Sequence, residues 1–307
     1  MYYIGFDIGG TKCAVALGEW DGENIRILAR EETKTQNSPI KTLEFLAPFI
    51  ERWTEEYRVF FAGISCGGPL DSEKGIIIST PNLAKEWHGF AIVSYIKERF
   101  GLCAKLENDA NACAVAEWKF GAGRGTKNMI FMTFGTGLGA GLILDGKLYG
   151  GTNGNAGEIG HIRLANGGPV GFHKAGSAEG FCSGNGIREL ALIRAREQGV
   201  SIEENITAKT VFERAYSGET FYKNIVRESA EKFGLVISIL LDLFNPEVIV
   251  AGGVFMRNYN LFMEHLTPIV ERESLFESRS VCKILPAKIG ENVGDYASLA
   301  LAISLEN

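Results

Sequence analysis

No stretch of this sequence is long and apolar enough to cross a membrane, which takes about 20 consecutive apolar residues. The most apolar helical stretch, residues 235–244, is too short and carries Asp242, so it is typical of a buried core helix. The N-terminus, MYYIGFDIGG, lacks the basic and cleavable apolar segments of a secretion signal. These absences predict a cytoplasmic protein without a membrane partner.

The sequence also lacks closely spaced cysteines and an excess of basic residues. Its six cysteines are scattered, with no pair at the spacing of metal ligands: Cys13, Cys66, Cys103, Cys113, Cys182 and Cys282. Such scatter is typical of reduced thiols in the cytoplasm. The formal net charge of −6 leaves no positive surplus to neutralise phosphates, so we expect no nucleic acid partner.

The overall amino-acid composition is that of a globular protein. With 307 residues, 46% of them hydrophobic, the chain can bury one large core or the cores of two domains. Strands that alternate with helices predict an α/β fold. The first part of the chain predicts strands at 2–8, 13–17, 25–28, 59–65, 75–78 and 103–106, and helices at 40–57, at 90–100 and from 109 onward.

One supersecondary pattern occurs twice. DIGGTK at residues 7–12 and GTGLGAG at residues 135–141 each place glycine and threonine between two apolar strands, and a turn and a third strand follow both. This repetition predicts a duplicated architecture with one copy in each half. After an irregular, glycine-rich region at 145–186, the pattern predicts helices at 186–198, 207–217 and 219–244, a strand at 247–253 and a closing helix at 294–305.

Both glycine loops have the composition of an anion-binding turn, because glycine lets backbone N–H groups approach a phosphate and threonine adds a hydroxyl donor. Neither is a P-loop or a dinucleotide fingerprint, and either alone could be only a tight hairpin turn. Two matching loops predict a bound nucleotide triphosphate, with a hydrated Mg²⁺ that Asp7 could orient, while Lys12 could be only a solvated charge. The residues predicted to hold ATP are Gly5, Phe6, Asp7, Ile8, Gly9, Gly10, Thr11, Lys12, Thr133, Phe134, Gly135, Thr136, Gly137, Leu138, Gly139, Ala140 and Gly141.

Polar side chains gather in KLENDANACAVAEW, residues 105–118, just before an alanine-rich helix. Asp and Asn are good helix N-caps, because their side-chain oxygens accept from free N–H groups of the first turn. Asp109 could therefore be a cap, or it could be a general base held at the start of a helix. The motif alone leaves both interpretations open.

A second short motif resembles the nucleophile elbow of hydrolases. GISCG at residues 63–67 matches Gly-x-Ser-x-Gly. That elbow needs a turn from a strand into a helix, whereas Gly68-Pro69 and another strand follow here. We therefore interpret Ser65 as a buried serine at the end of a strand.

Taken together, the motifs resemble those of the ROK family of bacterial sugar kinases, within the actin and hexokinase superfamily. The resemblance covers nearly the whole chain, through DIGGTK, ENDANA, GTGLGAG, NGNAGEIGH, NPEVIVAGG and IGENVGDYASLALA. It implies two domains of the actin/hexokinase-like (ribonuclease H-like) fold, with ATP and sugar in a cleft between them. We place the smaller domain at residues 1–114 with the closing helix at 291–307, and the larger at 115–290.

The resemblance implies roles for single residues. Asp109 becomes the general base, and Asn108 beside it binds sugar hydroxyls without adding charge. The implied sugar contacts are Gly68, Asn82, Asn108, Asp109, Glu158, His161 and Glu179, and Gly252 and Gly253 lie near the adenine. Donors and acceptors suit a polyol, because each buried hydroxyl needs a partner. By themselves, Asn82 could hold a turn and His161 could be a packed histidine.

The sequence departs from the family where relatives carry a structural zinc loop. The family has Cys-x-Cys-Gly-x-x-Gly-Cys after this histidine, whereas Val170, Phe172 and Ser177 stand at the thiolate positions here. A closed zinc site needs four nitrogen or sulfur ligands, more than His161 and His173 can supply. We therefore expect no zinc, and we expect Val170 and Phe172 to hold the loop by apolar packing.

The expected activity is transfer of the γ-phosphate of ATP to a hydroxyl, at C6, of a hexose or N-acetylhexosamine. The identity of the sugar does not follow, because the pocket walls lie in the irregular region at 145–185. By resemblance we also expect a homodimer. The alternative is a non-catalytic sugar-sensing regulator, since the family includes repressors. Those carry a helix-turn-helix ahead of the first glycine loop, and we expect none here because FDIGGTK begins at residue 6.

Overall fold

The computed structural model describes residues 1–306, in which strands and helices alternate as predicted. Among these residues no helix is long and apolar enough to cross a membrane. The described chain divides into two compact units: unit 1 has residues 1–125, 148–156 and those from 291 onward, and unit 2 has residues 126–147 and 157–290. The domain division at residues 114 and 290 stays a prediction, because compactness does not show which parts fold independently.

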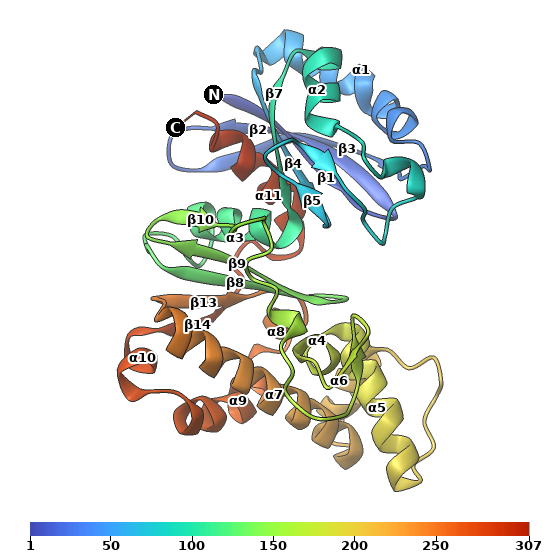
Figure 1. The fold of residues 1–307 in the computed structure, drawn as a ribbon, viewed down its shortest axis with the longest axis vertical. Helices are drawn as coiled ribbons and strands as arrows, with labels where there is room; N and C mark the ends of the chain where they lie inside the picture. Colours follow the sequence, from blue (N-terminus) through green and yellow to red (C-terminus); the bar gives the residue numbers. More distant parts are fainter. Residues whose placement is uncertain (307) are drawn as a thin grey trace. The chain divides into compact units, whose positions relative to one another are not determined.

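Unit 1 is built on a five-stranded sheet in the order β3-β2-β1-β4-β7 (Figure 1). The first three strands form an antiparallel meander, and the last two add in parallel to β1. Their bounds are β1 (Tyr2–Ile8), β2 (Lys12–Trp20), β3 (Ile25–Lys34), β4 (Phe61–Cys66) and β7 (Cys103–Asn108). β3 ends at Lys34, six residues beyond the predicted end at residue 28. The prediction stopped short because charged side chains along the exposed part of β3 obscure the strand pattern.

Helices cover both faces of this sheet (Figure 1). One face packs on α1 (Pro39–Tyr57) and α2 (Ile92–Phe100), with Trp53 fully enclosed among strand residues. The other face packs on α11 (Val293–Ile303), and α3 (Asp109–Phe120) lies beside α11. The smaller elements of unit 1 are β5 (Leu70–Asp71), β6 (Ile76–Ile77) and the 3₁₀ turn η1 (Lys85–Trp87).

Glycine allows α11 to approach the sheet closely. A Cβ on Gly63 of β4 would lie 1.9 Å from the carbonyl oxygen of Ser298, and one on Gly5 of β1 would lie 2.2 Å from the Ser298 hydroxyl. Because real Cβ contacts are never this short, a larger residue at either position would push α11 away. Gly5 thus serves helix packing.

Unit 2 repeats the sheet of unit 1. Its order is β10-β9-β8-β13-β14, again with an antiparallel first part and two parallel additions. The bounds are β8 (Met129–Phe134), β9 (Leu138–Leu144), β10 (Lys147–Tyr149), β13 (Val248–Ala251) and β14 (Lys283–Pro286), and residues 148 and 149 of β10 are counted with unit 1. The duplication predicted from the two glycine loops is therefore confirmed.

The helices of unit 2 enclose a core rich in phenylalanine. Phe233 of α7 (Thr220–Phe244) and Phe262 of α9 (Tyr259–Glu273) pack ring to ring with Phe134 of the sheet. Phe255 of α8 (Gly253–Arg257) packs on Phe233 and Phe262 in turn. α7 ends as predicted at Asn245-Pro246, with Asn245 in the left-handed conformation. The remaining elements are η2 (Ile159–His161), β11 (Val170–Gly171), β12 (Lys174–Ala175), α4 (Ala178–Phe181), α5 (Gly184–Gln198), α6 (Ala208–Tyr216), α7 (Thr220–Phe244), α8 (Gly253–Arg257), α9 (Tyr259–Glu273), α10 (Phe276–Val281) and η3 (Gly290–Asn292).

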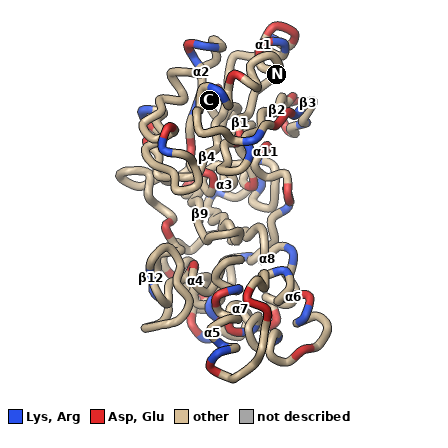
Figure 2. Tube along the Cα trace, turned by 90° about the vertical axis from the view of Figure 1, so that its right-hand side faces the viewer, with Lys and Arg blue, Asp and Glu red and all other residues tan. Residues whose placement is uncertain are grey.

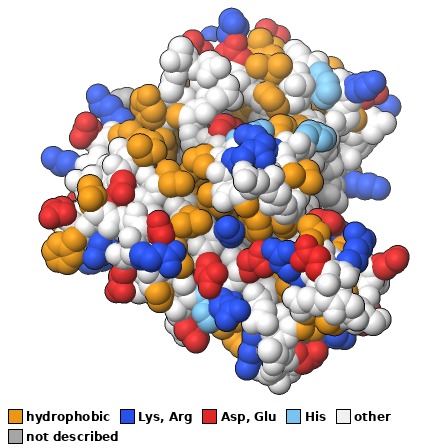
Figure 3. All heavy atoms as spheres, turned by 60° about the horizontal axis from the view of Figure 1, so that its bottom comes forward, with side chains coloured by type: hydrophobic (Ala, Val, Ile, Leu, Met, Phe, Trp, Pro, Cys, Tyr) orange, Lys and Arg blue, Asp and Glu red, His pale blue; other side chains and the backbone are white. Residues whose placement is uncertain are grey.

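Charged residues of both signs are spread over each unit. Figure 2 shows basic and acidic positions interspersed along the chain, and Figure 3 shows them intermixed on the face that it presents. Many are paired, such as Arg194 with Glu228 at 2.5 Å in unit 2. The surface charge is therefore balanced locally.

Candidate active site

In unit 1, strand register brings three acidic side chains to one end of the sheet. Asp7 of β1 pairs with Ser65 of β4, which pairs with Glu107 of β7. These strands are parallel, so their carboxyl ends share one edge. Asn108 and Asp109 follow Glu107 directly. In open α/β sheets this edge is where ligands bind.

The N-cap of α3 is Asn108, the residue before Asp109. Asn108 Oδ1 accepts from the N–H of Ala110 at 2.9 Å. Asp109 lies in the first turn with an exposed side chain, and its Oδ1 also accepts from Ala110. The protein atoms crowded around it raise the pKa of Asp109 by desolvation, and the Ala110 N–H partly opposes this. An accessible carboxylate of raised basicity can accept a proton.

A neighbouring network fixes this turn, and the sequence analysis missed it. Glu107 Oε1 accepts from the N–H of Asn108 at 2.9 Å, from Asn111 Nδ2 at 3.0 Å and from the Ser72 hydroxyl at 3.4 Å. Asn111 is buried, and its Oδ1 has no partner. Glu107 lies on β7, two residues before α3 begins, and Asn111 lies in the first turn of α3, so the helix periodicity of the sequence gave no signal for this contact.

Asp7 lies in an acidic environment. Burial, and then the charges of Asp295 and Asp109, raise the pKa of Asp7 to about 6, while Arg30 and Lys12 lower it. Arg30 is itself held by Asp295, with Nε to Oδ2 at 2.8 Å. A cation would stabilise the ionised carboxylate, so Asp7 fits the chemistry of a hydrated Mg²⁺.

The first glycine turn lies against Asn82. The turn comprises residues 9–11 and closes with the N–H of Gly9 donating to the carbonyl of Lys12 at 3.1 Å. A Cβ on Gly10 would lie 2.4 Å from the Asn82 carbonyl oxygen. Asn82 is exposed there, beside the predicted phosphate contacts.

Gly68 lies beside the start of α3. A Cβ on Gly68 would lie 3.3 Å from Asn108 Nδ2, and one on Gly67 would lie 4.0 Å from Asp109 Oδ2. The segment is held by the Thr80 hydroxyl, which donates to the carbonyl of Gly67 at 2.7 Å. Gly68, Asn108 and Asp109 are thus brought together, as the predicted sugar contacts require.

Several residues predicted to hold ATP are buried parts of strands. The turns themselves are only residues 9–11 and 135–137, because β2 begins at Lys12 and β9 begins at Leu138. The buried members of the predicted set are Gly5, Phe6, Ile8, Phe134, Leu138, Ala140 and Gly141, and its more accessible members are Asp7, Gly9, Gly10, Thr11, Lys12, Thr133, Gly135, Thr136, Gly137 and Gly139. The buried members can act only as a scaffold for the turns.

In unit 2, Gly253 lies against the start of the second glycine turn. The N–H of Gly135 donates to the carbonyl of Gly137 at 3.1 Å, and Thr133 Oγ1 accepts from Gly139 at 2.9 Å. A Cβ on Gly253 would lie 2.1 Å from the Phe134 carbonyl oxygen, and Gly253 has φ +57°, so both space and backbone conformation favour glycine. Gly252 donates to the carbonyl of Met132 at 3.0 Å. The predicted adenine-side pair therefore lies beside the second turn.

Glu158, His161 and Glu179 come from neighbouring short elements. Glu158 is exposed and precedes η2, which contains His161, and Glu179 lies on α4. A Cβ on Gly160 would lie 3.3 Å from the Glu179 Cβ. The His161 ring meets the Phe172 ring edge to face, with centroids 4.9 Å apart. These residues line one region of unit 2.

The loop at the family's zinc position is held by polar contacts, which corrects the expected apolar packing. Val170 and Phe172 are each 57% exposed, so burial of either contributes little. Instead, Lys174 Nζ donates to the His161 carbonyl at 2.7 Å, and buried Ser177 caps α4 through the Gly180 N–H. The described residues contain no group of three or more metal-ligating side chains. The absence of zinc itself stays a prediction.

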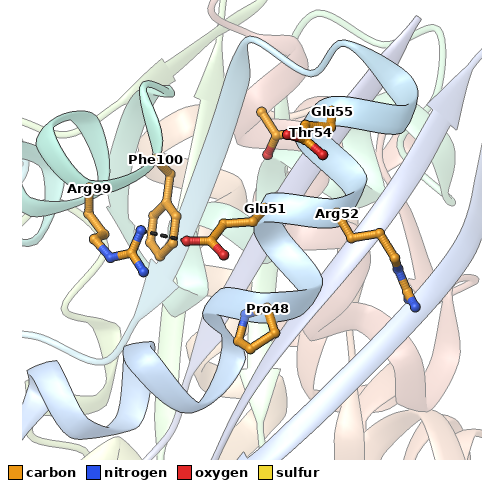
Figure 4. Close-up of a pocket in the computed structure, with 7 residues that line it drawn as sticks. All are labelled: Pro48, Glu51, Arg52, Thr54, Glu55, Arg99 and Phe100. Carbon is orange, nitrogen blue, oxygen red and sulfur yellow. Dashed lines mark hydrogen bonds and ion pairs between the residues drawn. The ribbon is translucent and has the colours of Figure 1, made fainter.

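Two other features lie outside this arrangement. Ser65 is 2% exposed inside β4, as the sequence predicted, so its hydroxyl cannot meet a substrate. A surface hollow of about 540 Å³ runs from Pro48 of α1 to Phe100 of α2 and contains no predicted site residue (Figure 4). Its Arg99 is bound by Glu44 and Glu51, so its charge is already neutralised.

The fold and site together define an α/β protein of the actin/hexokinase-like class, with a glycine turn after the first strand of each duplicated sheet. The chain belongs to the ROK family, whose model matches residues 3–304. A glucokinase of Streptomyces coelicolor is 29% identical over 97% of this chain and 96% of its own. The structure of a ROK family glucokinase from Streptomyces griseus with glucose and AMPPNP has a TM-score of 0.78 at 29% identity, covering 99% of this chain and all of that one. A xylose repressor of Caldicellulosiruptor bescii is 28% identical over 98% of this chain and 78% of its own.

Proposed function

We propose that this ROK-family chain is an ATP-dependent sugar kinase with Asp109 as its general base. The observation that carries the proposal is the edge of the unit 1 sheet, where the exposed Asp109 carboxylate lies beside Asn108 and near Asp7. Asn108 is the N-cap, and the Asp109 side chain, whose Oδ1 shares the Ala110 N–H, remains exposed. The relative from Streptomyces griseus with glucose and AMPPNP supports the same interpretation.

In the proposed reaction Asp109 accepts a proton from the attacking sugar hydroxyl. The hydroxyl oxygen, at C6, forms a bond to the γ-phosphorus in line with the bond that breaks, and ADP leaves with the electron pair of that bond. The proton passes from Asp109 to solvent after the transfer. Phosphoryl transfer needs mainly positioning and charge stabilisation, so one carboxylate without a basic partner is sufficient.

Mg-ATP is the proposed phosphate donor. The N–H groups of the turns at 9–11 and 135–137 would donate to its phosphate oxygens, and Thr11 and Thr136 would add hydroxyl donors. Asp7 would bind a water of the Mg²⁺. Gly252 and Gly253 would lie on the adenine side.

The proposed acceptor is a hexose or an N-acetylhexosamine. The residues proposed to contact its hydroxyls offer both acceptors and donors: Gly68, Asn82, Asn108, Asp109, Glu158, His161 and Glu179. A set without a single basic side chain other than His161 suits an uncharged polyol better than a sugar phosphate. We also propose a homodimer in the cytoplasm.

A coupled ADP-release assay across hexoses and N-acetylhexosamines tests the activity, and Asp109→Asn tests the base. The amide keeps the shape of the carboxylate but cannot accept the proton, so kcat is expected to fall at least about 100-fold. The dissociation constant of the sugar, measured by titration calorimetry, is expected to stay within a few fold. Asp145→Asn, the same change in an exposed turn, is the matched control. Near-normal turnover of Asp109→Asn would refute the assigned base.

The second candidate is a non-catalytic sugar-sensing regulator. The similarity to a xylose repressor over 98% of this chain favours it. A regulator would bind sugar without releasing ADP from any sugar of the panel. Measured turnover above the rate of ATP hydrolysis without sugar would exclude it.

A further inference from the structure

One hydrogen bond in unit 2 joins the second glycine turn to a residue that the proposed function assigns to the sugar. Glu179 Oε2 accepts from the N–H of Leu138 at 3.0 Å. Leu138 is the first residue of β9 and follows the turn at 135–137 directly. The carboxylate therefore fixes the point where the nucleotide turn meets its strand.

Gly137 shows how closely the carboxylate lies against this turn. A Cβ on Gly137 would lie 2.6 Å from Glu179 Oε2. Gly137 is not among the residues with positive φ, so its backbone conformation is open to any residue. The absence of a side chain at Gly137 thus leaves room for the Glu179 carboxylate.

The base of the Glu179 side chain is clamped, so only its carboxylate end can move. A Cβ on Gly171 would lie 2.7 Å from the Glu179 Cβ, and one on Gly160 would lie 3.3 Å from it. Its helix α4 is anchored by the buried cap Ser177. A change at the carboxylate is therefore transmitted to the turn and is not absorbed by the helix.

We propose that Glu179 is a positioning residue that couples sugar binding to nucleotide binding. A carboxylate has two oxygens, so it can accept from Leu138 and from a sugar hydroxyl at once. A bound sugar holds the carboxylate against Leu138 and so preorganises the turn at 135–137 for phosphate, while a bound phosphate holds the turn and so preorganises Glu179 for the sugar. The coupling rests on the proposed function and is reciprocal, as linkage requires.

Gly137→Ala tests the link from the nucleotide side. The new Cβ would displace the flexible carboxylate end while the fold is kept. Without nucleotide, the Kd for glucose, or for the panel sugar with the highest turnover, is expected to rise about tenfold, as when a charge-assisted hydrogen bond is lost. Gly167→Ala is the matched control, because its Cβ would meet nothing within 4 Å and it lies outside the predicted sites. It is expected to leave this sugar Kd unchanged.

Titration with AMPPNP, with and without the sugar, measures the coupling itself. In the wild-type protein the sugar is expected to lower the AMPPNP Kd about fivefold or more. Gly167→Ala should keep this ratio, and Gly137→Ala should bring it close to one. Equal sugar affinities and equal ratios in the two variants would overturn the coupling and leave the kinase proposal intact. A wild-type chain that binds neither sugar nor AMPPNP would overturn the proposed function itself.

Glu179→Asp provides the test if Gly137→Ala does not fold in a thermal unfolding measurement. It keeps the charge but withdraws the carboxylate from Leu138 by one methylene. Without sugar, the AMPPNP Kd is then expected to rise, because the turn loses its support. An unchanged AMPPNP Kd would overturn the proposal, since a residue that only contacts the sugar has no effect on nucleotide in the absence of sugar.

Discussion

Asp7 is a half-buried carboxylate with two other carboxylates near it, an arrangement that costs stability. Burial and the charges of Asp295 and Asp109 raise its pKa to about 6 in the folded protein, against about 3.9 in an unfolded chain. Between these values the folded state binds more protons, so stability falls as pH rises through this window. Such unfavourable charge persists where function requires it.

Asp7→Asn is therefore expected to stabilise the protein at neutral pH. The gain at pH 7.5, without nucleotide or metal, should be on the order of 2 kcal/mol in the free energy of unfolding. It should shrink below pH 6 and vanish below about pH 3, where Asp7 of the wild-type protein is protonated in both states. Urea unfolding of both proteins across this range measures the difference. A variant less stable than wild type at pH 7.5 would contradict the electrostatic account.

At the scale of elements, the hairpin of β11 and β12 is tied to His161 by a lysine side chain. Phe172 and His173 form its turn with positive φ values of 42° and 65°, as a two-residue hairpin turn demands. The tie is the hydrogen bond from Lys174 Nζ to the His161 carbonyl. The hairpin thus has polar contacts where relatives are expected to have zinc.

Lys174→Met is expected to weaken sugar binding, because it keeps the stem of the side chain but removes the donor. The loss should be about 1 kcal/mol, or roughly fivefold in the sugar Kd. A zinc chelator should change neither this Kd nor the thermal midpoint of the wild-type protein. Lys147→Met, on an exposed strand, is the control. Stoichiometric zinc by elemental analysis, or unfolding by the chelator, would contradict a metal-free loop.

Helices and strands with a clear hydrophobic periodicity could be predicted from the sequence. Elements that depend on contacts between residues far apart in the sequence could not. The strand pattern gave β1, and the helix pattern with its Asn245-Pro246 stop gave α7. The pattern predicted no element for residues 259–273, which form α9 with Pro268 inside. A proline usually ends a helix, but here packing of Phe262 and Leu266 in the core maintains it.

Those residues of the candidate site that belong to sequence motifs could be predicted. The residues of ENDANA and of the two glycine turns were identifiable, because their residue types carry the chemistry. The link from Glu179 to Leu138 was not, because the two are 41 positions apart in the chain. The extent of the turns was also misjudged, since glycines 139 and 141 resemble loop residues but lie in β9. Sequence gives residue types, and only the fold gives their neighbours.

At the scale of the whole molecule, the duplicated sheets explain why one weak motif became informative. A single glycine turn between strands is common in hairpins. The second sheet has the same strand order, with its own glycine turn after the same strand. Two copies of one arrangement favour a shared role, which is why phosphate binding is proposed for each of the two glycine turns.

The net negative charge of the chain predicts that it does not bind DNA, and this distinguishes a kinase from a DNA-binding regulator. The formal net charge is −6, and basic residues are interspersed with acidic ones (Figures 2 and 3). Binding to DNA without sequence preference depends on clustered positive charge and is strongest at low salt. Fluorescence anisotropy of a labelled random-sequence duplex should therefore stay unchanged on adding the protein at about 50 mM salt. A rise in anisotropy that disappears with added salt would instead favour the regulator, because it would reveal a basic surface that competes for phosphates.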